Sequence, residues 1–94
     1  MRPPAVAGQF YPGSSAELRR QLDEFMPPVE EMPIVGGVVP HAGYVYSGRI
    51  AAMVYSRLPK RETYVILGPN HHGLGSPVAL SRDSWRTALV LVTP

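Results

Sequence analysis

The feature that most constrains the fold is a pair of short apolar segments separated by a helical pattern. Residues 34–39 (IVGGVV) and 64–67 (YVIL) are rich in β-branched side chains and show no polar alternation. Continuous apolar character of this kind is typical of strands buried on both faces of a parallel sheet. A helix is expected between them, over residues 47–58. This order predicts a βαβ unit with a right-handed crossover, and therefore an α/β fold with a parallel or mixed sheet flanked by helices.

Two helices are expected beside that sheet. Ser14 and Glu17 have the spacing of a capping box, in which each side chain bonds a free backbone N–H of the other residue. Apolar residues then follow at helical spacing until Pro27 and Pro28, which cannot donate the backbone hydrogen bonds of a helix. The second helix should have one apolar face and end at Pro59. That face consists of Ile50, Val54 and Leu58.

Composition and charge exclude several classes of protein. The 94 residues suit one domain, 1–94, and a scattered net charge of +2 provides no basic stripe for nucleic acid or an anionic membrane. No apolar run approaches the roughly 20 residues of a membrane span. The absence of cysteine removes disulfides and zinc–thiolate sites from this chain. A cytoplasmic protein is the default expectation.

Histidines follow both predicted strands. His41 comes directly after the first and His71 shortly after the second. Ligands of open α/β sheets bind outside the carboxyl ends of the strands, so the two imidazoles are expected to face one pocket that binds a metal. The alternative for any single histidine is a hydrogen bond to a loop carbonyl, and this is favoured for His72, beside His71.

Two histidines alone do not complete a metal site. Zinc requires three or four protein ligands, and a non-haem iron triad requires a carboxylate as well. Asp83 is the nearest carboxylate downstream, and surface solvation is the preferred reading of it. Phe10 and Tyr11 are either a lid over the pocket or core. Tyr44 and Tyr46 either orient a substrate or donate a proton, or pack in the core or at the rim.

The end of the sequence is unusual. An apolar, β-like run over residues 88–92 is followed only by Thr93 and Pro94. A sheet left there would have an uncovered face or an unpaired edge, which intact domains usually cover. The chain is therefore expected to be cut short.

Three motifs together resemble the MEMO family, which includes the bacterial and archaeal AmmeMemoRadiSam system protein B. They are VAGQFYP at 6–12, PHAGYVYSG at 40–48 and ILGPNHH at 66–72. The resemblance covers nearly the whole chain, but only roughly the first third of a family member. After Trp85-Arg86-Thr87 the family usually continues with Pro-Leu-Gly, whereas this chain reads ALVLVTP. That departure indicates a truncated chain, a shifted reading frame or a partial sequence.

The resemblance implies a fold similar to LigB-type class III extradiol dioxygenases, with a metal pocket at the strand ends. By motif, the first two metal ligands of the family fall on His41 and His71, while His72 is not usually counted as a ligand. Phe10, Tyr44 and His72 are expected to lie around the pocket. The resemblance implies iron or copper rather than zinc, with the remaining ligands beyond Pro94. It also implies a link to a radical SAM protein and an AMMECR1-like protein.

Three functional hypotheses follow. The first is a fragment of an iron- or copper-dependent redox or dioxygenase-like protein of unknown substrate, with catalytic residues unassigned and no activity expected of this chain alone. The second is a non-enzymatic adaptor module that binds a peptide or small ligand in the same pocket. The third is an inactive truncated fragment.

Overall fold

The computed structural model describes residues 1–89 and 91–92. Helix α1 (Ser15–Phe25) begins and ends where its local signals predict. The backbone N–H of Glu17 donates to Ser14 Oγ at 3.2 Å, and the helix ends just before the two prolines. Leu18 is only 4% exposed, so the predicted apolar face of this helix is its buried face.

Helix α2 (Tyr44–Tyr55) lies three residues nearer the N-terminus than the predicted 47–58. Gly43 is its N-cap residue, and the backbone N–H of Tyr44 donates to the carbonyl oxygen of Phe10 at 2.8 Å. Ser47 does not begin the helix; its hydroxyl donates to the carbonyl oxygen of Ala42 at 2.9 Å. The start was mispredicted because its first N–H is satisfied by a residue distant in sequence.

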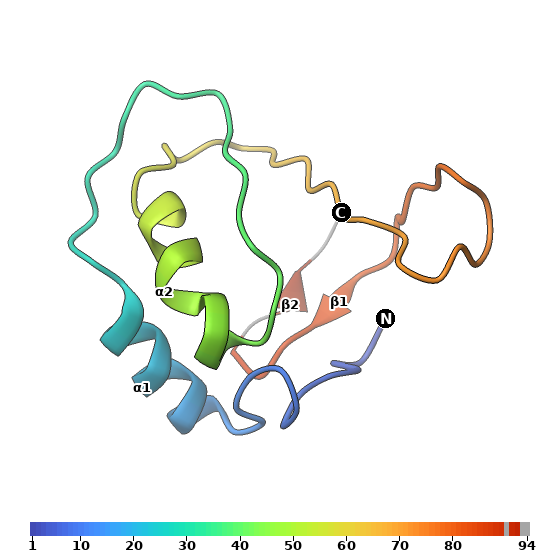
Figure 1. Cartoon of the computed structure of the whole chain (residues 1–94), viewed down its shortest axis with the longest axis horizontal. Helices are drawn as coiled ribbons and strands as arrows, with labels where there is room; N and C mark the ends of the chain where they lie inside the picture. Colours follow the sequence, from blue (N-terminus) through green and yellow to red (C-terminus); the bar gives the residue numbers. More distant parts are fainter. Residues whose placement is uncertain (90, 93–94) are drawn as a thin grey trace.

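The two helices lie side by side (Figure 1). Gly48 lies where α2 meets the end of α1. A Cβ atom on Gly48 would lie 2.7 Å from the Phe25 ring, so glycine permits the close approach. Farther along the chain, Ala52 is 5% exposed and the C-cap residue Ser56 is 2% exposed. Of the predicted apolar face, Ile50 is 57% exposed, so that face was only partly identified.

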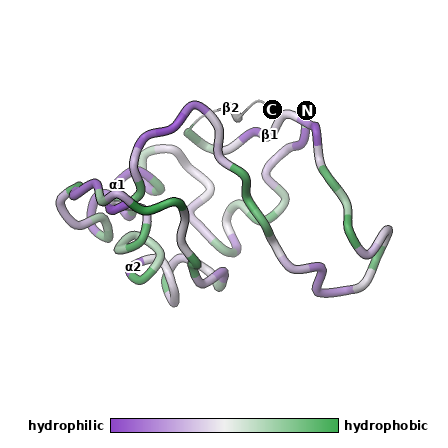
Figure 2. The backbone as a smooth tube through the Cα atoms, turned by 90° about the horizontal axis from the view of Figure 1, so that it is seen from above, coloured by the Kyte–Doolittle hydropathy of each residue, from purple (hydrophilic) through white to green (hydrophobic). Residues whose placement is uncertain are grey.

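The two segments expected to be buried strands are neither strands nor buried in the described part of the chain. Residues 34–39 and 64–67, hereafter the open segments, carry mostly exposed side chains. Among the described residues, the backbone groups of 35–39 and 65–67 make no backbone hydrogen bond. A strand exists only beside a partner strand, and neither segment has one here. Figure 2 shows hydrophobic stretches in the parts of the chain that lie outside the helices.

The strands observed are short and lie near the C-terminus. β1 (Trp85–Arg86) pairs antiparallel with β2 (Leu91–Val92). β2 covers part of the predicted β-like run, while Val90, Thr93 and Pro94 lie outside the described residues. The α/β class with a parallel or mixed sheet therefore stays a prediction for this chain.

The N-terminal residues pair with strand β1 of this hairpin. Arg2 forms a parallel bridge with Trp85. Its N–H donates to the carbonyl of Ser84 at 2.7 Å, and its carbonyl accepts from Arg86 N–H at 2.8 Å. The Arg2 guanidinium lies 4.8 Å from the centre of the Trp85 ring.

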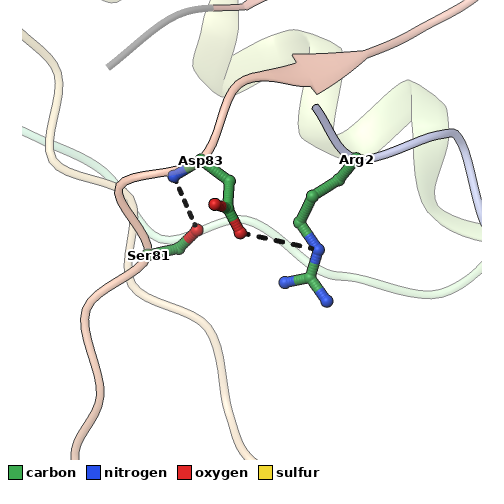
Figure 3. Close-up of polar contacts among 3 residues, drawn as sticks. All are labelled: Arg2, Ser81 and Asp83. Carbon is green, nitrogen blue, oxygen red and sulfur yellow. Dashed lines mark hydrogen bonds and ion pairs between the residues drawn. The ribbon is translucent and has the colours of Figure 1, made fainter.

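Asp83 faces Arg2 rather than solvent alone. In Figure 3 the two side chains point toward one another, with Arg2 Nε 3.9 Å from Asp83 Oδ2. The Asp83 N–H also contacts Ser81 Oγ at 3.4 Å. Solvation was thus only part of its role, although both charged side chains remain more than half exposed. No helix in the described residues has the length and hydropathy needed to cross a membrane.

Candidate functional site

His41 and His71 lie together although they are thirty residues apart. Their ring centres are 4.9 Å apart, and the ring planes are tilted by 43°. His41 lies in the loop before α2, and His71 lies in the loop after the second open segment; both are exposed. The juxtaposition expected from the strand ends is present without a strand ladder between the two segments.

The separation of the rings fits two ligands of one ion. Metal–nitrogen bonds of about 2.0–2.1 Å place an imidazole centre about 3.2 Å from the ion. Two ligating rings that subtend about 90–110° at the ion have centres about 4.5–5.2 Å apart. The observed 4.9 Å falls within that range. In the described part of the chain, no third histidine, cysteine, aspartate or glutamate joins such a group.

The His41 loop is held by contacts at the start of α2. The Ser47 hydroxyl binds the Ala42 carbonyl, and the Tyr44 N–H binds the Phe10 carbonyl. A Cβ atom on Gly43 would lie 3.4 Å from that Phe10 oxygen. These contacts fix the chain immediately after His41, so its imidazole projects from an anchored loop rather than from a free one.

Phe10 itself lies on a tight turn. Its N–H donates to the Val6 carbonyl at 2.9 Å, and the Gly8 N–H donates to the Tyr11 carbonyl at 2.7 Å. Gly8 has φ +82°, a conformation that suits glycine. The Phe10 side chain is half exposed, so this residue contributes to the site through its backbone carbonyl.

Tyr44 packs against Tyr11, a residue that the sequence left open as a lid over the pocket or as core. Their ring centres are 5.4 Å apart. Burial raises the pKa of Tyr44 above 10.0, and the nearby Tyr11 and Tyr55 raise it further. Tyr44 therefore keeps its phenolic proton at neutral pH. The sequence signal for Tyr11 is the aromatic doublet at Phe10-Tyr11.

The apolar cavity of the molecule is separate from the histidine pair. It is an open groove of about 770 Å³ between the two open segments, and Val54 and Leu58 form part of its wall. None of the predicted site residues lines it; those residues are Phe10, His41, Tyr44, His71 and His72. This groove is therefore not the pocket predicted for the two histidines, and that pocket stays a prediction. His72 is exposed beside His71.

Comparison with known proteins identifies relatives over nearly all of the chain. The family described as Memo-like protein matches residues 2–93. A MEMO1 family protein of Methanosarcina barkeri is 55% identical over 94 residues, covering 98% of this chain and 36% of the relative. One from Methanococcoides burtonii is 56% identical over 89 residues, covering 93% and 34%. One from Aquifex aeolicus is 47% identical over 90 residues, covering 93% and 34%.

The chain thus spans about a third of the length of these curated relatives. No solved structure matches it.

Proposed function

This chain belongs to the Memo-like protein family, and we propose from that premise that it holds a divalent metal ion between His41 and His71. The observation that carries the proposal is the 4.9 Å separation of the two rings. Two imidazoles leave coordination positions for water, for a ligand or for groups from elsewhere in a family-length protein.

We propose iron or copper rather than zinc as the ion at this site. Imidazole binds both metals, and among divalent first-row ions copper forms the strongest complexes with nitrogen ligands. The chain has no cysteine to form the thiolate sites that structural zinc favours. When bound, an ion with open positions would act as a Lewis acid toward an oxygen ligand.

The neighbouring residues have supporting roles in this proposal. Ser47 and Phe10 hold the loop that carries His41. Tyr44, three residues after His41, has a raised pKa and stays protonated, so its phenol is a candidate hydrogen-bond donor to a bound oxygen atom. The general base of any reaction stays unassigned.

Calorimetric titration of the purified chain with Cu²⁺ tests the proposal. We expect one ion per chain, with binding that weakens as the pH falls because only neutral imidazole binds metal. His41→Ala and His71→Ala should each weaken binding by at least about tenfold. His72→Ala is the matched control and should bind as the parent does. Unchanged affinity in both ligand variants would contradict the proposal.

For a family-length protein we propose a redox or dioxygenase-like role, with the substrate unidentified. The support is the histidine pair together with family membership. A metal-loaded protein of family length that includes these residues should consume oxygen in the presence of a reductant, and His41→Ala in it should abolish this. Oxygen uptake that does not depend on that histidine would count against the role.

A further inference from the structure

We propose that Gly8 is a positioning residue for the histidine pair: it shapes the turn over residues 6–11, whose Phe10 carbonyl fixes the start of α2 and with it the loop of His41. The proposal rests on the metal site proposed above. It gives a residue more than thirty positions before His41 a part in holding that ligand, although Gly8 itself does not contact the ion.

The first support is the way in which α2 begins. Its N-cap residue, Gly43, has no side chain that could bond the free N–H groups of the first turn. The Phe10 carbonyl accepts one of them from outside the helix, the Tyr44 N–H, at 2.8 Å. The Ser47 hydroxyl, by contrast, bonds carbonyl groups of the loop just before its own helix. The bond to Phe10 therefore ties this loop to a segment that is distant in sequence.

The second support is the turn that directs the Phe10 carbonyl. The Phe10 N–H donates to the Val6 carbonyl at 2.9 Å, and the Gly8 N–H donates to the Tyr11 carbonyl at 2.7 Å. Gly8 has φ +82°, which side chains of L-residues rarely adopt. A Cβ atom there would meet nothing within 4 Å. A side chain at Gly8 therefore changes the turn through its backbone conformation and not through a collision.

The third support is the close contact between the turn and the start of α2. A Cβ atom on Gly43 would lie 3.4 Å from the Phe10 carbonyl oxygen and 3.6 Å from its Cα atom. The rings of Tyr11 and Tyr44 also pack, with their centres 5.4 Å apart. Because the two segments meet through backbone and side chains, a change in the turn moves the start of α2 and the loop before it.

Calorimetric titration of the parent chain and of Gly8 variants with Cu²⁺ tests the proposal. Gly8→Ala should weaken binding by about fivefold or more, because a left-handed conformation disfavours alanine by at least that factor. Gly8→Asn should restore most of the affinity, since asparagine enters this conformation more readily than alanine. Gly36→Ala is the matched control: Gly36 has no positive φ, and a Cβ atom there would also meet nothing within 4 Å.

Two measurements without metal test the positioning role by itself. In the metal-free parent, the rings of His41 and His71 should give a nuclear Overhauser contact. This contact should weaken in Gly8→Ala, and the amide of Tyr44 should exchange at least about fivefold faster. Gly8→Asn should restore both. Far-UV circular dichroism should be the same in the parent and in both variants, which shows that α1 and α2 persist.

Equal Cu²⁺ affinity in the parent and in Gly8→Ala would overturn the positioning role and leave the metal site standing. A loss of affinity that Gly8→Asn does not reverse, or that Gly36→Ala shares, would also overturn it, as would a loss accompanied by unfolding of the helices. If the parent binds no Cu²⁺, the metal site is contradicted. An unchanged ring contact and unchanged Tyr44 exchange in Gly8→Ala would then overturn the positioning role as well.

Discussion

Gly36 and Gly37 are adjacent in sequence but differ in what surrounds them. A Cβ atom at Gly37 would lie 2.5 Å from Val54 Cγ1, whereas one at Gly36 would meet nothing within 4 Å. The pair therefore tests whether the first open segment lies against α2 in solution. A close approach of backbone to a helix is a use of glycine that sequence alone does not distinguish from flexibility.

Gly37→Ala should lower the free energy of unfolding by about 1–3 kcal/mol, because the added methyl group overpacks the contact with Val54. Gly36→Ala should change it by less than about 0.5 kcal/mol. Urea unfolding followed by circular dichroism measures both. Equal effects of the two substitutions would show that the segment does not contact α2.

Tyr44 predicts a dependence of stability on pH at the alkaline end. Its folded pKa is raised above 10.0 by burial, with Tyr11 and Tyr55 adding to the shift. The unfolded chain therefore releases this proton first as the pH rises, so the contribution is complete below pH 10.0 and is lost above it. Tyr44→Phe should remove this contribution to the loss of unfolding free energy at alkaline pH, while Tyr46→Phe should not.

The measurement is urea unfolding of the parent and both variants from about pH 8 to about pH 11, with tyrosinate absorbance recorded in parallel. An alkaline loss of stability that is identical in the Tyr44→Phe variant and the parent would contradict the assignment.

At the scale of elements, α1 was predictable because its signals are local. Ser14 caps the helix, and the prolines after Phe25 end it. The start of α2 was not predictable, since the Tyr44 N–H is satisfied by Phe10, more than thirty residues earlier. The β-like run over residues 88–92 includes β2, but β1, its pairing with β2 and the bridge to Arg2 were not predicted. Short strands depend on partners that sequence periodicity does not identify.

The hairpin yields a prediction of its own. Arg2→Ala removes a cation–π contact worth about 0.5–1 kcal/mol at an exposed site, together with a weak surface ion pair. We expect the Trp85 fluorescence to change and the amide of Arg86 to exchange faster. Arg82→Ala, at an exposed arginine beside the same ion pair, is the control. If both variants behave alike, Arg2 does not fasten the hairpin.

The whole molecule is less compact than a typical domain of its length. The radius of gyration is 14.2 Å, whereas a compact domain of this length has about 12 Å. Among the described residues, the buried apolar side chains are Leu18 and Ala52. The proximity of His41 and His71 was predictable from their positions after the two apolar segments. The βαβ unit stays a prediction, because among the described residues no strand lies beside the open segments.

A small core predicts that the free energy of unfolding depends only weakly on the urea concentration. The dependence of unfolding free energy on urea increases with the surface that becomes exposed, and this chain already exposes 8026 Å². The urea m-value should therefore fall below about 1 kcal/mol/M, the lower end for small proteins. A steep transition of the free chain would mean that the open segments are covered in solution.

The central claim is that His41 and His71 bind one ion together, and electron paramagnetic resonance of the Cu²⁺-loaded chain tests it most directly. With histidine labelled by ¹⁵N, the spectrum should show couplings to two imidazole nitrogens. It should show one in His41→Ala and one in His71→Ala, and two in His72→Ala. Spectra of the two ligand variants that match the parent spectrum would contradict the claim.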